Sequence, residues 1–432
     1  MKTLSTKDAS FRGFWSDFLR RSAEGDPAIE TTVKHILDDV RRRGDAAVLD
    51  YTSRFDGHRP AVLEVSPEEM AKAAASVPAK AMKALKTAAA RIHAFHRRQH
   101  GKLPRSWTVR ENGALLGEQV RPLDRVGIYV PGGLAAYPST VLMNAIPAKV
   151  AGVKEIVMVS PWREGRPNPA TLAAAKIAGV TKIFKIGGAQ AVAALAYGTA
   201  SIAAVDKIVG PGNAYVAAAK RLVFGKVGID MIAGPTEIVV IADERANPES
   251  VAADLLSQAE HDPMAVPILL THSQKLAAAA QSALERQIRS LERRAILKES
   301  LDGQGLVVQT KSLAESLDLS NQFAPEHLSL QIRNPEKSLS KVRHAGAVFL
   351  GPYSPVAFGD YLAGPNHVLP TSGTARFSSP LGVGDFLKRS SLIGMGQNAF
   401  ETLAPVVIEL AELEGLTAHG HSVDVRRKGN RS

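Results

Sequence analysis

The sequence predicts an α/β protein whose strands form parallel sheets. From Arg125 onward, short strands, glycine-containing turns and helices alternate with brief links, and the same alternation resumes after residue 236. This alternation is typical of parallel sheets with helices on both faces. The chain has 432 residues, 45% hydrophobic and 22% charged, as in ordinary globular proteins large enough for two or three domains. We therefore expect two α/β units.

The first hundred residues are predicted to be mostly helical. Helices with one polar face are expected at residues 29–43, 46–55 and 67–96. Gly44 and Asp45 separate the first two, because glycine commonly ends a helix and aspartate caps the next one. Strand-like alternation first appears at residues 107–110 and 115–120.

The two alternating units account for most of the remaining chain. The first has expected strands at residues 126–130, 155–160, 182–186 and 206–209, and expected helices at residues 138–151, 169–179, 189–196 and 213–224. The second has expected strands at residues 236–242, 266–271, 306–309, 328–332 and 347–350, and expected helices after Asn247 and at residues 274–293. We expect the N-terminal helices to complete the second unit.

The C-terminal end has a different pattern. Residues 380–391 lead to a predicted helix at 404–414, and residues 422–425 resemble a strand. The expected domains are an N-terminal helical arm (1–20), one α/β domain (21–125 with 237–380), a second α/β domain (126–236) and a tail (381–432). A small tail of this kind often reaches across to another subunit.

The composition narrows the function. No cysteine is present, so disulfides, thiolate metal ligands and a thiol nucleophile are excluded. No apolar run reaches the roughly 20 residues of a membrane span, and the first 15 residues lack the apolar core of a signal peptide; we expect a cytoplasmic protein without a membrane partner. The net charge of +11 accompanies only 5% aromatic residues, which favours solvated basic helix faces over nucleic-acid binding.

Three glycine turns are candidates for dinucleotide binding, although the sequence has no Gly-x-Gly-x-x-Gly between a strand and a helix. They are Pro131–Gly133, Gly187–Gln190 and Gly210–Asn213, and each follows an expected strand. Backbone N–H groups in such turns can face a pyrophosphate. An ordinary tight turn is the alternative, but Tyr129, Gln190 and Asn213 beside these turns favour a ligand.

A metal site is suggested by the helix that Asn247 caps and Pro263 stops. Gln258 and His261 are three residues apart, so both side chains lie on one flank near the end of this helix. An amide oxygen beside an imidazole can hold a divalent cation. A polar helix end without ligand is the alternative for this pair alone.

Residues 323–328, Phe-Ala-Pro-Glu-His-Leu, place an acid beside an imidazole. Pro325 favours an extended Ala324, so Glu326 and His327 are expected to begin a new element. Histidine can accept a hydroxyl proton near neutral pH and a carboxylate can activate water. A shared site requires a local bend, because neighbouring residues of a strand point to opposite faces; a surface Glu-His pair is the alternative.

Further donors lie in the loop at residues 358–370, which is rich in glycine and proline, and after the last predicted helix. The loop contains Asp360 and His367, and the later segment contains Glu414, Thr417 and His419. Gln258, His261, Asp360 and His419 together form an oxygen and nitrogen set suited to zinc or manganese.

Taken together, these stretches resemble the histidinol dehydrogenase family along nearly the whole chain. The matching segments include Tyr129-Val-Pro-Gly-Gly, Gly187-Gly-Ala-Gln-Ala, Val209-Gly-Pro-Gly-Asn, Ala233-Gly-Pro-Thr-Glu, Leu256-Ser-Gln-Ala-Glu-His, Ala324-Pro-Glu-His, Gly364-Pro-Asn-His-Val-Leu-Pro-Thr and Glu414-Gly-Leu-Thr-Ala-His. Many relatives have serine where this chain has Thr236, which keeps the hydroxyl. So many ordered matches make the resemblance specific.

The resemblance implies two incomplete Rossmann-like parallel-sheet domains with a small helical C-terminal tail region. It implies a homodimer that oxidises L-histidinol to L-histidine through the aldehyde, using two NAD per turnover. It also implies one Zn²⁺ per subunit, with each site completed by the other subunit's tail. The implied metal ligands are Gln258, His261, Asp360 and His419. Glu326 would activate water, His327 would accept the proton, and Tyr129, Gln190 and Asn213 would contact NAD. The implied substrate contacts are the four metal ligands with Thr236, His327, His367 and Glu414.

Three other functions remain open at this point. A dehydrogenase on the same fold could oxidise another small hydroxy compound, such as a sulfonated diol, although Glu414 and His419 favour a substrate with an imidazole and an amine. A non-catalytic metal-dependent binding protein would need the metal ligands but not the Glu326–His327 pair. A basic nucleic-acid-binding module would show salt-sensitive binding to DNA.

Overall fold

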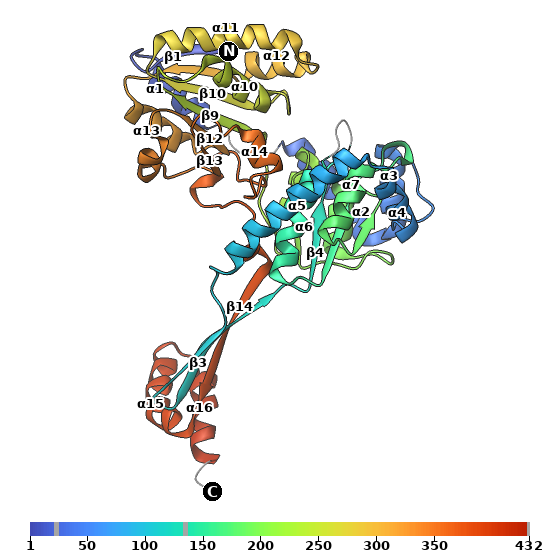
Figure 1. Cartoon of the computed structure of the whole chain (residues 1–432). Helices are drawn as coiled ribbons and strands as arrows, with labels where there is room; N and C mark the ends of the chain where they lie inside the picture. The colour runs from blue at the N-terminus through green and yellow to red at the C-terminus, as the bar shows by residue number, and fades with distance from the viewer. Residues whose placement is uncertain (21–25, 133–136, 430–432) are drawn as a thin grey trace. The chain divides into compact units, whose positions relative to one another are not determined.

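The fold was analysed in a computed structural model, which describes residues 1–20, 26–132 and 137–429 (Figure 1). By its contacts the chain forms two units. The larger contains Met1–Gly101 and Leu123–Phe386, and the smaller contains Lys102–Pro122 and Leu387–Ser432.

The first parallel sheet of the larger unit has five strands in the order β6-β5-β4-β7-β8. They are β4 (Arg125–Tyr129), β5 (Glu155–Val159), β6 (Lys182–Phe184), β7 (Lys207–Val209) and β8 (Gly228–Ile229). Numbered along the chain, this order is 3-2-1-4-5, the Rossmann order without its sixth strand. The order reverses between β4 and β7, where a ligand crevice is expected at the carboxyl ends of the strands.

Helices cover this sheet and form its core. Buried residues of one group of helices form a single apolar cluster with β4 and β5; these helices are α2 (Pro27–Arg43), α3 (Asp45–Asp56), α8 (Gly188–Tyr197) and α9 (Ala214–Val223). A second group packs around α6, which contacts β4 and β5; it contains α4 (Pro67–Ser76), α5 (Ala79–His100), α6 (Pro138–Ala151) and α7 (Pro169–Ala178).

The second parallel sheet has six strands in the order β1-β11-β10-β9-β12-β13. They are β1 (Lys2–Ser5), β9 (Glu237–Ala242), β10 (Val266–Thr271), β11 (Leu306–Gln309), β12 (His327–Gln331) and β13 (Ala347–Leu350). Without β1, this sheet repeats the 3-2-1-4-5 order of the first. Its central strands β9 and β10 are buried along their whole length, as expected for a parallel sheet covered on both faces.

Helices on the two faces of this sheet build two separate cores. One core contains α10 (Pro248–Ala259), α11 (Gln274–Gln287) and α12 (Arg294–Gly303). The other contains α1 (Phe11–Leu19) and α13 (Leu313–Phe323). The short α14 (Val356–Tyr361) follows β13 and contacts α10 (Figure 1). Short 3-10 helices occur at Arg163–Gly165, Ile288–Ser290, Pro335–Lys341, Thr374–Arg376 and Val383–Phe386.

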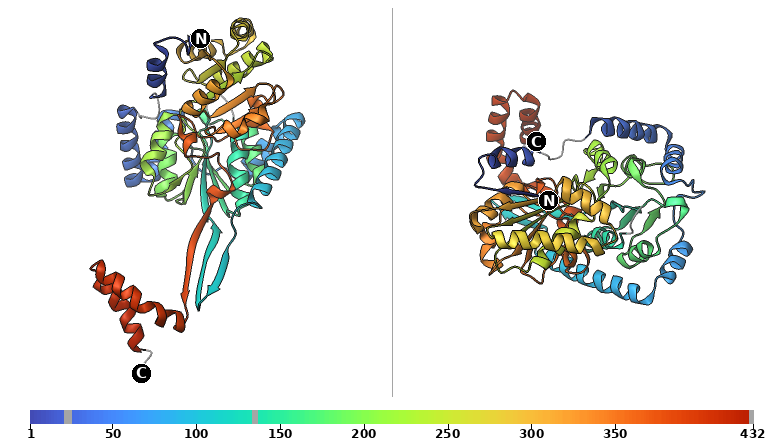
Figure 2. Two further views of the ribbon diagram at one scale, coloured as in Figure 1. Left: turned by 90° about the vertical axis from the view of Figure 1, so that its left-hand side faces the viewer. Right: turned by 90° about the horizontal axis from the view of Figure 1, so that it is seen from above.

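The smaller unit is an antiparallel ribbon that carries two helices (Figure 2). Its strands β2 (Trp107–Glu111), β3 (Ala114–Pro122) and β14 (Leu387–Met395) pair in the order β14-β3-β2. Asn112 and Gly113 connect β2 to β3 with φ of 49° and 81°, the left-handed conformation that a two-residue hairpin turn requires. The helices α15 (Gln397–Leu413) and α16 (Thr417–Gly429) pack on each other.

The predicted fold class is confirmed, because the chain contains two parallel sheets with helices and a small helical C-terminal region. Several predicted elements were wrong. The helix expected at 67–96 is two helices, because Pro78 cannot continue a helix from Val77. Residues 422–425 lie in α16 instead of a strand. Residues 387–395, for which no strand was expected, form β14 and gain their backbone partners from β3.

The distribution of the N-terminal segments also differs from the expected domains. Residues 1–20 contain α1, but Lys2–Ser5 forms an edge strand beside β11 instead of part of a helical arm. Helices α2 and α3 were expected to complete the later unit, yet their apolar faces pack on the five-stranded sheet. Amphipathic periodicity identifies a buried face without identifying the sheet that covers it. Within the described residues, no helix is both long and apolar enough to span a bilayer.

Candidate functional site

Glu326 and His327 lie at the amino end of β12, which pairs with β9 and β13 in the six-stranded sheet. The preceding helix α13 ends at Phe323, and Ala324 adopts the left-handed conformation with φ of 54°. The expectation of an extended Ala324 was therefore wrong, because helix termination here uses a left-handed residue although proline follows. Glu326 and His327 follow the turn at Ala324-Pro325, and both residues are buried.

Three groups contact the same oxygen of the Glu326 carboxylate. Thr236 Oγ1 and the backbone N of Glu237 donate hydrogen bonds to Oε2, the latter at 2.9 Å, and His327 Nδ1 lies 3.4 Å from it. Burial alone would raise the pKa of Glu326, but attraction to His327 and these hydrogen bonds outweigh burial and hold its pKa below the ordinary value. Glu326 is therefore ionised, with Oε1 outside these three contacts.

His327 is oriented by the backbone of β9. Its Nδ1 lies 2.9 Å from the carbonyl oxygen of Glu237, so Nδ1 carries the proton and Nε2 is the proton-accepting nitrogen of the neutral ring. Burial alone would lower the pKa of His327, but the neighbouring Glu326 carboxylate outweighs burial and raises the pKa to about 9. Asp360 adds to this increase, which places its carboxylate near the imidazole.

Gln258 joins the same network through Thr236. It lies in the last turn of α10, where its Nε2 donates to Thr236 Oγ1, and Thr236 in turn donates to Glu326. Gln258 Oε1 is buried and has no hydrogen-bond partner. An unpaired buried amide oxygen costs free energy unless a cation or donor satisfies it, so this atom fits a metal ligand.

Asp360 and His367 lie near the pair. Asp360 is in α14 instead of the expected loop, and His367 lies in the segment after this helix. His367 Nδ1 lies 2.9 Å from the carbonyl oxygen of Asp360, and its Nε2 lies 3.4 Å from Thr140 Oγ1 at the start of α6. Burial lowers the pKa of His367, which favours a neutral imidazole. His261 follows the end of α10 and is exposed.

Glu414 and His419 belong to the smaller unit, at the end of α15 and in α16. The predicted metal ligands are thus divided between the two units. In the described part of the chain, no cluster of three or more His, Cys, Asp or Glu side chains could hold a metal. The larger unit contains three of the predicted ligands, but only His261 and Asp360 are of these residue types, because the third ligand is Gln258. These three ligands alone therefore could not form such a cluster. The four-ligand set remains a prediction.

The predicted cofactor residues share a pocket of about 690 Å³ in the five-stranded sheet's lobe. Tyr129, Gln190 and Asn213 line it together with Gly132 and Gly188; Gly133 lies outside the described residues. Tyr129 ends β4 and its hydroxyl accepts a hydrogen bond from the N–H of Gly188 at 2.9 Å. Both amide atoms of Gln190 are buried without a partner. These unsatisfied atoms in a pocket point to a polar ligand.

A buried ion pair holds the glycine turn that leads to Asn213, one of the residues that line this pocket. Lys220 on α9 pairs with Asp230, and their side chains are 2% and 1% exposed. Lys220 Nζ donates to the carbonyl oxygen of Gly210 at 2.9 Å, and the N–H of Gly210 donates to Asp230 at 2.7 Å. Gly210 has φ of 108°, and a Cβ there would lie 2.3 Å from the Tyr129 carbonyl oxygen. The pair thus fixes the turn that leads to Asn213.

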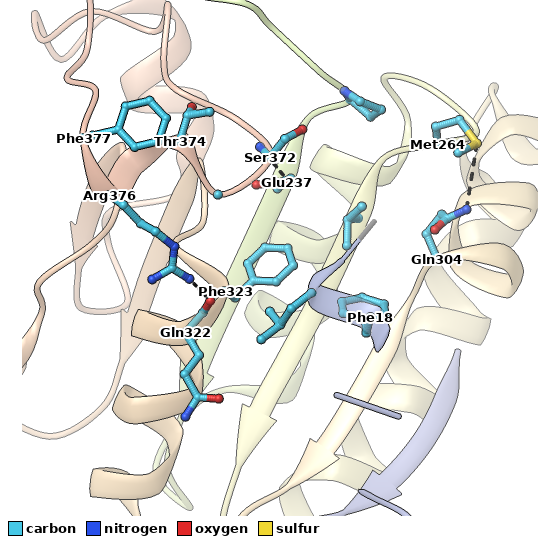
Figure 3. A pocket seen from close by; sticks show the side chains of 14 residues that line it. Phe18, Glu237, Met264, Gln304, Gln322, Phe323, Ser372, Thr374, Arg376 and Phe377 are labelled. Atoms are coloured by element: carbon cyan, nitrogen blue, oxygen red, sulfur yellow. Dashed lines mark hydrogen bonds between the residues drawn. The ribbon is translucent and has the colours of Figure 1, made fainter. Parts of the chain in front are cut away.

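Glu237 is a site residue that sequence reasoning missed. Its backbone contacts both Glu326 and His327, while its side chain lines a separate cavity of about 380 Å³, where Ser372 N donates to it at 3.1 Å (Figure 3). Burial, and then repulsion by Glu326, raise the pKa of Glu237 to about 8. Its position directly after Thr236 was the available signal, but a single acid at a strand start is common.

Comparisons with known proteins show the family of the chain. The sequence model of the histidinol dehydrogenase family matches residues 19–427. The chain belongs to the histidinol dehydrogenase family. It is 54% identical to a histidinol dehydrogenase from Syntrophotalea carbinolica over 431 residues, covering 99% of each chain. It is also 54% identical to one from Bordetella parapertussis over 429 residues, covering 98% of this chain and 96% of the relative.

A solved member of the histidinol dehydrogenase family has the same fold. The crystal structure from Elizabethkingia anophelis superposes with a TM-score of 0.91 at 38% identity, covering 100% of this chain and 99% of that one. Membership of the histidinol dehydrogenase family makes the chain an oxidoreductase. The roles of single residues do not follow from these comparisons and rest on the geometry above.

Proposed function

We propose that the chain oxidises L-histidinol to L-histidine through L-histidinal, reducing two NAD for each substrate, as the last step of histidine biosynthesis. The observation that carries this proposal is the buried network of Gln258, Thr236, Glu326 and His327. It combines a base, a carboxylate and an unsatisfied amide oxygen at one end of β12. A non-catalytic metal-binding protein would not need the base His327 or the carboxylate Glu326.

The residues present are suited to bind two groups, Zn²⁺ and NAD. Gln258 Oε1 has the character of a metal ligand, and His261, Asp360 and the partner subunit's His419 would complete a set suited to one Zn²⁺ per subunit. The unpaired amide of Gln190 fits a polar cofactor. When bound, zinc supplies a Lewis acid that holds the substrate's imidazole and amine, and NAD supplies the hydride acceptor.

His327 serves as the base in both oxidations. Its Nε2 accepts the proton of the substrate hydroxyl as the C–H bond breaks, while its Nδ1 keeps its own proton and donates it in a hydrogen bond to the Glu237 carbonyl oxygen. This hydrogen bond keeps the ring oriented in both protonation states. The adjacent Glu326 carboxylate stabilises the imidazolium that forms.

Glu326 serves in the second half of the reaction. Water must add to the aldehyde carbon before the second oxidation, because the chain has no cysteine for a thioester route. The three contacts to Oε2 leave Oε1 to take the proton from that water. As water adds, His327 gives the proton from the first oxidation to the former carbonyl oxygen, which completes the hydrate. The neutral His327 then accepts the proton of a hydrate hydroxyl, as it did from the alcohol.

Thr236, His367 and Glu414 are the further substrate contacts of the proposal. Thr236 is already bonded to both Gln258 and Glu326, so it links the metal ligand to the carboxylate. We further propose that the enzyme is a cytoplasmic homodimer in which the partner subunit's Glu414 and His419 complete each site. The division of these residues between two units supports this arrangement.

The test is the amount of NADH formed per L-histidinol consumed, with zinc, after chelation and after zinc is restored. Two NADH per substrate, lost on chelation and recovered with zinc, is the expected result. One NADH per substrate would indicate a simpler alcohol dehydrogenase, and none would reject histidinol as the substrate. Glu326→Gln should end turnover with the metal content unchanged, whereas unaltered turnover would remove Glu326 from the mechanism.

A further inference from the structure

Asp56, the last residue of α3, lies in the wall of the candidate cofactor pocket with Tyr129 and Gln190. Its Oδ2 atom is buried and has no hydrogen-bond partner. A buried carboxylate oxygen without a donor is costly, and such groups in native proteins are usually satisfied by a ligand or by water. Asp56 is therefore an acceptor without a donor in a pocket of about 690 Å³.

The electrostatics agree with a charged acceptor. Burial raises the pKa of Asp56 to about 6, and Arg163 opposes this increase. Burial raises the pKa of the Tyr129 hydroxyl to about 12, and the charge of Asp56 adds to this effect, so the two groups lie close together. At pH 8 Asp56 is ionised and faces the pocket beside a predicted cofactor residue.

The pocket has the lining expected for a nucleoside end rather than for the reacting end of a dinucleotide. Glu326 and His327 belong to the other sheet and do not line it. Phe55 and Tyr215 line it and are 48% and 43% exposed, so their rings are available to a flat base. Gln190 offers a further donor and acceptor.

We propose that Asp56 accepts hydrogen bonds from the vicinal hydroxyls of the adenosine ribose and selects NAD over NADP. This inference rests on the proposed function, in which NAD is the oxidant. An ionised carboxylate can accept from both hydroxyls. A 2′-phosphate in the same position would be repelled by the carboxylate and would leave it without a donor.

The other charged side chains of the pocket should shift the preference toward NADP once Asp56 is substituted. Arg54, Arg163 and His35 also line it. Once the negative charge of Asp56 is removed, the guanidinium groups of Arg54 and Arg163 remain in the pocket lining and attract a 2′-phosphate. Neutral variants of Asp56 should therefore lose NAD efficiency and gain relative efficiency with NADP.

The experiment compares the full-length enzyme with Asp56→Asn and Asp56→Ser, measuring kcat/KM for NAD and NADP with L-histidinol and zinc at pH 8. We expect kcat/KM for NAD to fall about 10- to 100-fold, mainly through KM, because a hydrogen bond to a charged group is lost. The ratio of NAD to NADP efficiency should fall by at least the same factor. Asp38→Asn, on an exposed position of α2, should leave both values unchanged.

A measurement on the unmodified enzyme tests the same point if the variants fold poorly. ADP-ribose and 2′-phospho-ADP-ribose are compared as competitive inhibitors against NAD, and the phosphorylated compound should bind at least about 10-fold more weakly. Equal inhibition, or variants with the wild-type NAD to NADP ratio, would overturn the role of Asp56. An unmodified enzyme that reduces neither cofactor with histidinol would instead overturn the proposed function.

Discussion

Neighbouring residues of the proposed catalytic network set each other's charge. His327 is buried, yet its pKa is raised to about 9 because the attraction of Glu326 outweighs the cost of burial. Glu326 is buried too, yet its pKa stays below the ordinary value through the same pairing. The resting site therefore holds an imidazolium next to a carboxylate at neutral pH. His327 must lose that proton before it can act as a base.

This pairing predicts the pH dependence of the reaction. We expect kcat/KM for histidinol to rise with pH, with an acid limb well above the ordinary imidazole pKa of 6.5, because only the neutral His327 accepts a proton. In Glu326→Gln the attraction is absent, so the His327 pKa falls and the limb should move to lower pH. The measurement is the rate of the first NADH formed in a single turnover, recorded as a function of pH in both enzymes. This step precedes the hydration for which Glu326 is proposed.

The matched control for that experiment is Glu336→Gln, an exposed acid in the 3-10 helix after β12. The acid limb of the pH profile of Glu336→Gln should coincide with that of the unmodified enzyme. If the Glu326→Gln limb also stays in place, the charge of Glu326 does not govern His327.

The sequence identified the main residues of this network but not their connections. Glu326 and His327 share one motif, whereas Thr236 and Gln258 come from two others, and the structure joins all three motifs through close polar contacts. Glu237 and Asp56 were missed because an acid beside a strand or at a helix end is usually solvated. Their unusual pKa values arise from burial, which local sequence does not reveal.

At the scale of the elements, the two sheets place their candidate sites at opposite ends of their strands. The cofactor pocket lies at the carboxyl ends of β4 and β7, where the strand order reverses. Glu326, His327 and Thr236 lie at the amino ends of β12 and β9, although the order reverses there too. The general rule for open α/β sheets places ligands at carboxyl ends, so the six-stranded sheet departs from it.

The Lys220–Asp230 pair is predicted to couple the stability of its lobe to cofactor affinity. Lys220→Met leaves Asp230 buried without its cation, which should lower the free energy of unfolding by about 3–5 kcal/mol. The same change frees the turn at Gly210 and should raise the KM for NAD more than it lowers kcat. Urea unfolding and steady-state kinetics measure the two effects.

A double variant separates the buried charge from the turn. Lys220→Met with Asp230→Asn removes the charge but keeps an oxygen that can accept from Gly210 N, so much of the stability should return. Lys176→Met, at an exposed position of α7, serves as the control. A double variant as unstable as the single one would show that charge burial is not the cause.

Secondary structure was predictable where local signals are strong. The alternating strands and helices after residue 125 were expected from glycine turns and apolar runs, and they occur close to the expected positions. The strands β1 and β14 were not expected, because their stability comes from partners about 300 residues away and in β3 respectively. Helix α16 replaced an expected strand because residues 422–425 are too few to show a period.

For the whole molecule, the smaller unit carries an apolar stripe that supports the proposed dimer. Leu403, Val406, Val407, Leu410 and Leu413 recur at helical spacing on α15, and each is 43–75% exposed. Exposed apolar stripes of this kind on a folded chain mark surfaces that are covered by another protein. A second copy of the chain is the partner implied by the proposed function.

We predict that Leu410→Glu converts the dimer to monomers and abolishes turnover, since a charge in the centre of an apolar interface is not compensated. Light scattering coupled to size exclusion measures the mass, and NADH formation measures the activity. Glu412→Lys, a charge change on the opposite side of α15, should keep both. A Leu410→Glu enzyme that remains dimeric and active would place the subunit contact elsewhere.

The pairing of β1 with β11 has a consequence for biosynthesis. Lys2–Ser5 is synthesised long before its partner, because Leu306–Gln309 leaves the ribosome roughly 300 residues later. At typical translation rates of about 5–20 residues per second, this delay is roughly 15–60 seconds. During that time the segment is an unpaired strand edge, and its polar residues Lys2, Thr3 and Ser5 limit wrong pairing with other nascent chains. The six-stranded sheet, which holds the proposed catalytic pair, is thus completed late, after the five-stranded sheet has already been synthesised.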